Sequence, residues 1–161
     1  MKKLRIYVDT SVLGECFDPE FSPWSNALVE DFRRGLFRPV LSEVTAAEVE
    51  RAPEEVRSVL IELLALGAEM IPVSPEALAL VVHYESHGVL GPRFRNDMLH
   101  IALATLAEVD VLVSWNFRHI VRLDKIRLFN AVNAEQGYKT LAIYSPREVA
   151  THERNENDPG R

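Results

Sequence analysis

The sequence predicts an α/β fold in which a parallel sheet is covered by helices on both faces. Short β-rich runs alternate with longer stretches of helical periodicity, the pattern that repeated strand-helix units produce. The chain has 161 residues, of which 47% are hydrophobic and 26% charged, so it can bury the core of one domain but not of two ordinary ones. We find no internal repeat and no low-complexity linker. We therefore predict one domain over residues 1–149.

The first strand and helix are marked by a short apolar run and a proline. Residues 4–8 read as a strand. After a loop, Ser22 followed by Pro23 is typical of an N-cap with proline at the first helical position. That helix is predicted to run to about residue 34, because Gly35 is a suitable stop.

The second strand is followed by two helices. Residues 37–41 predict a strand, and Ser42 is a candidate N-cap for a helix that carries Glu48 on its second turn. A further helix is predicted over 54–66, where apolar residues recur at helical spacing and Gly67 supplies the stop.

The second half repeats the same alternation. Residues 69–73 are a strand candidate, and Ser74 with Pro75 caps a helix that ends near Gly88. A loop over 89–95 and a helix with Asp97 in its first turn follow. The remaining predicted elements are a strand at 110–114, a turn at 115–117, a helix at 124–136 with Asp124 as its cap, a strand at 141–144 and another N-cap at Ser145.

Composition restricts the class of protein. The net charge of −6 argues against a uniformly basic DNA-binding protein, although a local basic patch can coexist with it. Cys16 is the only cysteine, so no internal disulfide can form, and a reducing cytosol is the natural compartment. No run approaches the ~18 apolar residues that a membrane span requires. We expect a soluble, cytoplasmic protein without a membrane partner, and a disordered polar tail over residues 150–161.

Three separated acidic residues suggest a metal site. Asp9 follows the first strand, Glu48 lies on an early helical turn, and Asp97 opens a later helix. In a parallel sheet these positions meet at the carboxyl edge, where ligands usually bind. Carboxylate oxygens suit a hard divalent cation. Alternatively, each residue could be an ordinary turn, surface or helix-dipole acid.

The order of these features resembles the PIN-domain family of metal-dependent ribonucleases, which includes the VapC-type toxins of toxin-antitoxin pairs. The resemblance extends to about residue 149. It is carried by residues 6–13 (IYVDTSVL), Ser42 with Glu48, Asp97 with residues 100–102 (HIA), and residues 112–117 (LVSWNF). The resemblance implies a three-layer α/β/α sandwich with a central parallel sheet, in which Asp9, Glu48 and Asp97 bind Mg²⁺ or Mn²⁺.

The sequence departs from the family at Asn116, which stands where many members carry a fourth acidic residue. The resemblance implies a subgroup in which this asparagine is the fourth metal ligand and catalytic residue. Mg²⁺ accepts amide oxygens and keeps several waters. With one negative charge fewer, we expect a one-metal site, or a second metal that is recruited only with substrate phosphate.

Cations and polar groups flank the predicted ligands. Arg118 and Arg122 follow the Asn116 turn, and Arg93 and Arg95 precede Asp97; they are candidates for contacts to the RNA backbone. A solvated surface would explain the same arginines equally well. Further candidate cations are His119, Lys125 and Arg127. The candidate groups that support the metal ligands are Thr10, Ser11 and His100.

Several of these residues have ordinary structural explanations. His100 lies three residues after Asp97, on the same helical face, and a buried, hydrogen-bonded histidine explains it as well as a supporting role does. Trp115 and Phe117 could stack on a nucleobase, but packing at a strand end is the simpler interpretation.

The predicted function is metal-dependent endoribonuclease activity on RNA phosphodiester bonds, as the toxin of a type II toxin-antitoxin pair. Its alternative is a catalytically weak PIN-like domain that binds RNA or a protein partner. A dehalogenase-type phosphatase is disfavoured because Ser11 stands where its second aspartate belongs. The resemblance also implies an antitoxin partner and a homodimer. The apolar stripe of residues 54–66 could form the dimer interface or could be buried in the core.

Overall fold

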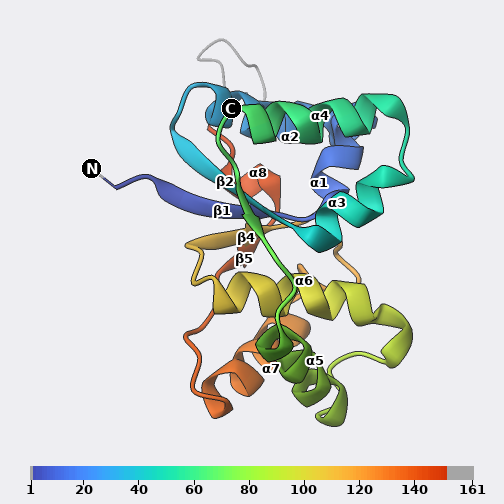
Figure 1. Ribbon diagram of the computed structural model, residues 1–161, viewed down its shortest axis with the longest axis vertical. Helices are drawn as coiled ribbons and strands as arrows, with labels where there is room; N and C mark the ends of the chain where they lie inside the picture. Colours follow the sequence, from blue (N-terminus) through green and yellow to red (C-terminus); the bar gives the residue numbers. More distant parts are fainter. Residues whose placement is uncertain (1, 152–161) are drawn as a thin grey trace.

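A computed structural model describes residues 2–151 of the chain (Figure 1). Its centre is a five-stranded sheet in which all strand pairs are parallel and the order is β3-β2-β1-β4-β5. The α/β prediction is therefore confirmed. The strands are β1 (Leu4–Val8), β2 (Phe37–Ser42), β3 (Glu69–Ile71), β4 (Val111–Val113) and β5 (Ile143–Tyr144).

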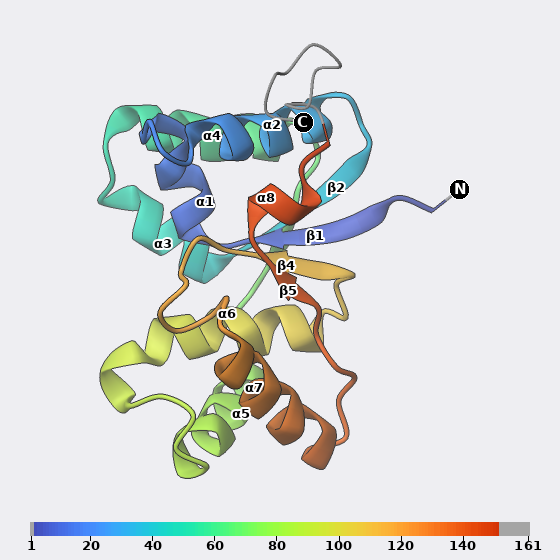
Figure 2. The ribbon, with the colours of Figure 1, turned by 180° about the vertical axis from the view of Figure 1, so that it is seen from behind.

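Helices cover both faces of the sheet and complete three layers. Helices α1, α2, α4 and α8 lie on one side, and α5, α6 and α7 lie on the other, as the views from the front and from behind agree (Figures 1 and 2). The α-helices are α1 (Thr10–Gly14), α2 (Ser22–Arg33), α3 (Glu43–Glu50), α4 (Glu54–Ala65), α5 (Pro75–Ser86), α6 (Arg95–Leu106), α7 (Leu123–Glu135) and α8 (Pro146–Val149). Two short 3₁₀ turns are η1 (Glu15–Phe17) and η2 (Pro92–Phe94).

The alternation of side chains along β1 divides the core in two. Ile6 and Val8 pack with the α1, α2 and α4 layer, whereas Tyr7 packs with the α5, α6 and α7 layer. Successive side chains of a strand point to opposite faces of a sheet. Because Tyr7 faces α6, its hydroxyl can reach side chains of that helix.

The predicted caps at Ser42 and Ser74 are confirmed, since their hydroxyls accept the backbone N–H groups of Thr45 and Ala77. Other boundaries differ from the prediction. The helix predicted from an Asp124 cap begins at Leu123 with Arg122 as N-cap, and Asp124 lies in its first turn. The cap proposed at Ser22 is the first residue of α2, with Phe21 as the N-cap.

Two predicted loops contain helical turns, and three predicted strands are shorter. The strand predicted over 110–114 is Val111–Val113, and the one predicted over 141–144 is Ile143–Tyr144. The region after β1 forms α1 and η1, and the loop over 89–95 contains η2. The third strand stops at Ile71 instead of reaching residue 73. Pro72 follows it, and a proline has no N–H group to donate to a ladder.

The last described residues are attached to α2. Ala150 is buried, and Thr151 donates its backbone N–H and its hydroxyl to the carboxylate of Asp31, at 2.8 and 2.7 Å. The rest of the predicted tail, residues 152–161, lies outside the described residues. None of the helices in residues 2–151 has the length and apolar character needed to cross a membrane.

Candidate active site at the carboxyl edge of the sheet

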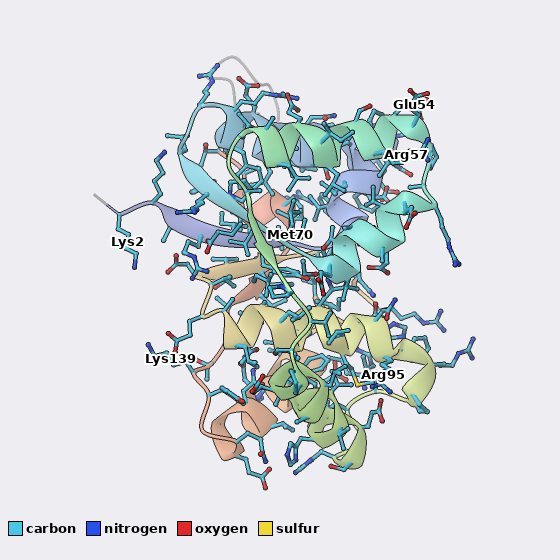
Figure 3. All side chains as sticks on the ribbon, in the orientation of Figure 1. Lys2, Glu54, Arg57, Met70, Arg95 and Lys139 are labelled. Atoms are coloured by element: carbon cyan, nitrogen blue, oxygen red, sulfur yellow. The ribbon has the colours of Figure 1, made fainter. Side chains whose placement is uncertain are left out.

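The three predicted acidic residues lie on three elements at the carboxyl edge of the sheet. Asp9 is the N-cap of α1 directly after β1, Glu48 lies on α3 after β2, and Asp97 is in the first turn of α6. Helices α1 and α3 and the start of α6 occupy the same side of the molecule (Figure 1). Figure 3 shows Arg95, the first residue of α6, on this side, and Lys2 and Lys139 on the opposite one.

Asp9 is buried and held by two hydroxyl groups. Its side chain is only 4% exposed. Ser11 donates to Oδ1 at 2.6 Å and Ser114, which follows β4, donates to Oδ2 at 2.7 Å. Burial raises the pKa of Asp9, although the charge of His100 and the two serine hydrogen bonds oppose this. Both carboxylate oxygens are therefore oriented by hydroxyls, one from α1 and one from the residue that follows β4.

Glu48 is oriented by Thr10 and His100. The Thr10 hydroxyl donates to Oε1 at 2.8 Å, and Nε2 of His100 lies 2.6 Å from the same oxygen. Burial alone would raise the pKa of Glu48, but hydrogen bonds and the charge of His100 outweigh it, with help from Thr10 and Asn96, and lower the pKa. Glu48 is therefore ionised at neutral pH, in contact with α1 and α6.

His100 connects Glu48 to the strands through its other ring nitrogen. Its Nδ1 lies 2.6 Å from the hydroxyl of Tyr7, and that hydroxyl lies 2.7 Å from the hydroxyl of Ser42. Burial disfavours the imidazolium, but the influence of Tyr7 and the contact with Glu48 outweigh burial and raise the pKa of His100 to about 10. A charged ring donates from both nitrogens, which fits its two oxygen neighbours. The two sequence-level interpretations of His100 thus coincide, because it is buried and supports Glu48.

The raised pKa of His100 predicts a dependence of stability on pH. Because the folded-state pKa of about 10 exceeds the ordinary value of 6.5, the contribution of His100 is complete below about pH 6.5 and is lost as pH rises towards 10. Urea unfolding of the metal-free protein in EDTA should show a free energy of unfolding that falls over this range. His100→Gln should flatten that fall; an equal fall in the variant would contradict the assignment.

Asp97 and Asn116 meet at His119. Nδ1 of His119 lies 3.1 Å from Oδ2 of Asp97, and its backbone N–H donates to Oδ1 of Asn116 at 2.9 Å. The ring of Phe94 packs against the imidazole, with centroids 4.0 Å apart. Asn116 therefore stabilises the turn after β4, and this turn places His119 beside Asp97.

A surface pocket of about 540 Å³ opens between α3 and the start of α6. Glu48 and Asn96 line it, together with Ala47, Glu50 and Arg51. Within residues 2–151, no group of three or more acidic, histidine or cysteine side chains is arranged to hold a metal ion. The four-residue ligand set of Asp9, Glu48, Asp97 and Asn116 therefore stays a prediction.

Some of the predicted basic residues interact with other side chains or with the backbone of the described residues, and others do not. Arg122 forms an ion pair with Asp124 at 2.8 Å, although both side chains are more than half exposed. The guanidinium of Arg93 lies 5.3 Å from the centroid of the Phe94 ring. Lys125, one of the further candidate cations, donates to the carbonyl of Val89. In the described part of the chain, the exposed side chains of Arg95 and Arg118 have no hydrogen-bonding partner.

Sequence reasoning missed residues whose importance depends on tertiary contacts. Tyr7 and Ser114 were placed on strands within the motifs that carry the resemblance, and Asn96 at a helix start, but none of the three was given a role at the site. Ser114 could have been found, because it occupies the same strand-end position on β4 that Asp9 occupies on β1, in the register Val8↔Val113. The Tyr7 to His100 contact spans 93 positions and has no local signal. Arg51, which directly follows the helix of Glu48 and lines the same pocket, was also missed.

Comparison with known proteins supports the fold assignment. No family model and no curated protein matches the sequence. A chain from the crystal structure of VapBC2 from Rickettsia felis, bound to a DNA fragment from their promoter, is similar with a TM-score of 0.56 and 16% identity over 88% of this chain and 98% of that chain. The fold is PIN-like.

At 16% identity the likeness to VapBC2 concerns the fold alone. Tyrosyl-tRNA synthetase from Archaeoglobus fulgidus, complexed with L-tyrosine, also aligns, with a TM-score of 0.44 and 14% identity over 90% of this chain and 55% of that chain. That score is too low to support a relationship. The predicted PIN-like sandwich is confirmed, and the predicted asparagine subgroup stays a prediction.

Proposed function

We propose that this protein is a Mg²⁺- or Mn²⁺-dependent endoribonuclease. The main support is that hydrogen bonds at the carboxyl edge hold Asp9 and Glu48 in place from both sides. Asp9 is fixed by Ser11 of α1 and by Ser114 after β4, and Glu48 by Thr10 and by the buried His100. Such networks orient acidic groups for a task, because ligating carboxylates are themselves hydrogen-bonded in working metal sites.

The donor set fits a hard divalent cation in its chemistry. Asp9, Glu48 and Asp97 would supply carboxylate oxygens and Asn116 an amide oxygen, all of the type that Mg²⁺ prefers. Oδ1 of Asp97 accepts no hydrogen bond from the described residues, whereas Oδ1 of Asn116 already accepts one from His119. Mg²⁺ sites usually use one or two carboxylates with waters and substrate phosphates, so a preformed cage of three acids is not required.

The chemistry would be hydrolysis of a phosphodiester bond. A bound divalent ion would lower the pKa of water and stabilise charge on the phosphate. The protein side chains would orient the oxygen ligands of the metal and neutralise the negative charge of the RNA phosphates. Arg118, Arg95 and Arg51 are exposed near these elements, and arginine forks suit phosphate oxygens. Thr10 and Ser11 would keep Glu48 and Asp9 in position.

A substitution at Asn116 is expected to increase the affinity for the metal. Asn116→Asp should tighten binding of Mg²⁺ or Mn²⁺, because it adds a charge while a carboxylate can still accept the His119 N–H. Asn116→Ala should change metal affinity only modestly, since it removes the turn hydrogen bond and no charge. Isothermal titration calorimetry measures both. If the aspartate variant bound metal no more tightly than the natural protein, Asn116 would lie outside the field of the ion.

If Arg118 and Arg122 contact RNA phosphates, the affinity for RNA should depend on salt concentration. RNA binding should weaken as salt rises, with a log-log slope of about 0.7 per phosphate neutralised on a single strand. Arg118→Ala should lower that slope by somewhat under one unit. Arg122→Ala should lower it less, because Arg122 must leave Asp124 to reach a phosphate. Filter binding at several salt concentrations in EDTA provides the measurement.

Arg34→Ala is the control for the salt experiment, because Arg34 is an exposed residue at the C-cap of α2 that pairs with Glu30. Its slope should equal that of the natural protein. If Arg118→Ala also left the slope unchanged, the run after Asn116 would be a solvated surface, and the phosphate contacts should then be sought at Arg93 and Arg95.

We also propose the biological setting that the resemblance implies. The protein would be the toxin of a toxin-antitoxin pair in the cytoplasm, with an antitoxin protein partner and a homodimeric assembly. VapBC2, to which the fold is similar, is described as bound to promoter DNA. The α4 stripe is only partly used by the core: Leu63 is buried, whereas Ile61 and Leu64 are exposed. Those exposed residues are available for such an interface.

The rival function is an RNA-binding PIN-like domain with little catalysis. It is favoured by one observation, the amide at position 116 in place of a carboxylate. Both functions predict the same salt-dependent RNA binding. Only the nuclease predicts cleavage that requires a divalent metal, so a cleavage assay separates them.

A further inference from the structure

A second pocket lies beside the candidate active site and is lined mainly by aromatic side chains. Its volume is about 330 Å³. Its walls come from the start of α2, the segment after β4 and the short helix α8. The lining residues are Glu20, Phe21, Trp24, Trp115, Phe117 and Arg147.

The aromatic rings of the lining pack against one another, and Phe117 is the most exposed of them. Phe21 and Trp115 are stacked, with centroids 4.5 Å apart and planes at 28°. Trp115 is nearly buried, and its ring N–H donates to Ser25 at 2.7 Å, which fixes the indole. Phe117 stands 6.0 Å from Trp115 at 66° and is 48% exposed. An exposed phenyl face beside fixed rings can accept a further planar group.

The aromatic pocket is directly connected to the acidic site. The backbone N–H of Trp115 donates to the Ser11 hydroxyl at 2.9 Å, and that hydroxyl donates to Asp9 at 2.6 Å. Trp115 also follows Ser114, the other residue that binds Asp9. The aromatic pocket and the acidic site therefore share the segment after β4 and lie next to each other in the fold.

The charged residues of the pocket lining indicate what kind of group the pocket can hold. Arg147 places its guanidinium 5.6 Å from the centroid of the Trp24 ring, and Glu20 is the other charged residue in the lining. A carboxylate in the lining repels a phosphate, so the pocket interior suits an uncharged flat group. The arginine can contact the adjoining phosphate. Aromatic rings with a nearby arginine are the usual platform for unpaired bases in single-stranded nucleic acid.

We propose that this aromatic pocket binds one unpaired nucleobase of the RNA strand whose backbone lies at the acidic site. The base stacks against Phe117 beside the Trp115 wall, and Arg147 contacts the neighbouring phosphate. This inference rests on the proposed function in that it assumes an RNA ligand. It adds a base-binding subsite and predicts a preference for single-stranded over paired RNA, because a paired base cannot leave its stack without a cost.

Intrinsic fluorescence provides a direct test, because both tryptophans of the chain line the pocket. The natural protein is titrated in EDTA with a short oligoadenylate and, separately, with an abasic strand of the same length and charge. The oligoadenylate should quench the tryptophan emission and bind more tightly. Phe117→Ala should weaken oligoadenylate binding about tenfold and leave binding of the abasic strand unchanged.

Phe17→Ala is the matched control, because Phe17 is 52% exposed and lines a different pocket beside α4. It should bind both strands as the natural protein does. Phe117→Leu keeps apolar bulk against Phe21 and Trp115, and should lose affinity for the base-containing strand while keeping its thermal stability. That result excludes a general folding defect as the cause.

The outcomes separate this inference from the proposed nuclease. Base-dependent quenching in a protein that cleaves no RNA would support the pocket and refute the nuclease. Metal-dependent cleavage with equal binding of the two strands, or with unchanged affinity in Phe117→Ala, would overturn the pocket and leave the nuclease intact. An absence of quenching would also overturn it.

Discussion

Asp9→Asn is expected to lower the rate of metal-dependent RNA cleavage by about a thousand-fold. The substitution removes the charge of the predicted central ligand. Loss of several kcal/mol of metal-assisted charge stabilisation corresponds to roughly three orders of magnitude. The asparagine has nearly the same shape and still accepts a hydrogen bond from Ser11 or Ser114. Initial rates on a labelled single-stranded RNA with Mg²⁺ or Mn²⁺ measure the effect.

The control is Asp110→Asn, which makes the same charge change just before β4, at the opposite edge of the sheet, where Asp110 accepts the backbone N–H of Arg5. It should cleave at the natural rate. Because burial disfavours the charge of Asp9, Asp9→Asn should fold with equal or higher thermal stability. Equal cleavage rates in the two variants would remove Asp9 from the catalytic site.

His100→Ala is expected to destabilise the metal-free protein by about 3 kcal/mol. The change leaves the Glu48 carboxylate without its charged partner and creates a cavity in the core beside Tyr7. For a chain of this size, such a loss lowers Tm by roughly 6–12 °C. Differential scanning calorimetry in EDTA measures it.

His87→Ala is the matched control for His100→Ala. His87 also contacts a glutamate, Glu135, at 2.8 Å, but both side chains are exposed, at 41% and 58%. Exposed pairs contribute little, so Tm should change by less than about 3 °C. If both variants lost the same stability, the His100 network would not hold the site together.

The fold was predictable because its signals are local. Ser42 and Ser74 are followed by helical stretches, and the structure confirms both caps. The alternation of strands and helices fixed the α/β class. In contrast, α1 has only five residues, too few to be stable without tertiary packing. Val12 and Leu13 are buried in the core below α2 and α4, and that burial explains a helix which the sequence presented as a loop.

The positions of the acidic residues in the candidate site could be predicted from the sequence, but their hydrogen-bond partners could not. Asp9 and Glu48 follow directly from strand-end and helical-turn positions. Their partners do not, because the chain of contacts from Ser42 through Tyr7 to His100 joins β2, β1 and α6. It depends on which face of β1 meets α6, and a strand pattern that is apolar on both faces does not reveal this. The role of Asn116 is different, because its Oδ1 accepts the backbone N–H of His119 only three residues later, a local turn contact that asparagine commonly makes.

A metal-dependent nuclease site at the acidic carboxyl edge should cleave RNA only when a divalent metal is present. The most direct measurement is cleavage of one labelled single-stranded RNA by the natural protein, first in EDTA and then after addition of excess Mg²⁺ or Mn²⁺ to the same sample. We predict internal cleavage products only after the metal is added. Cleavage that proceeds equally in EDTA, or intact RNA in the presence of either metal, would contradict the account.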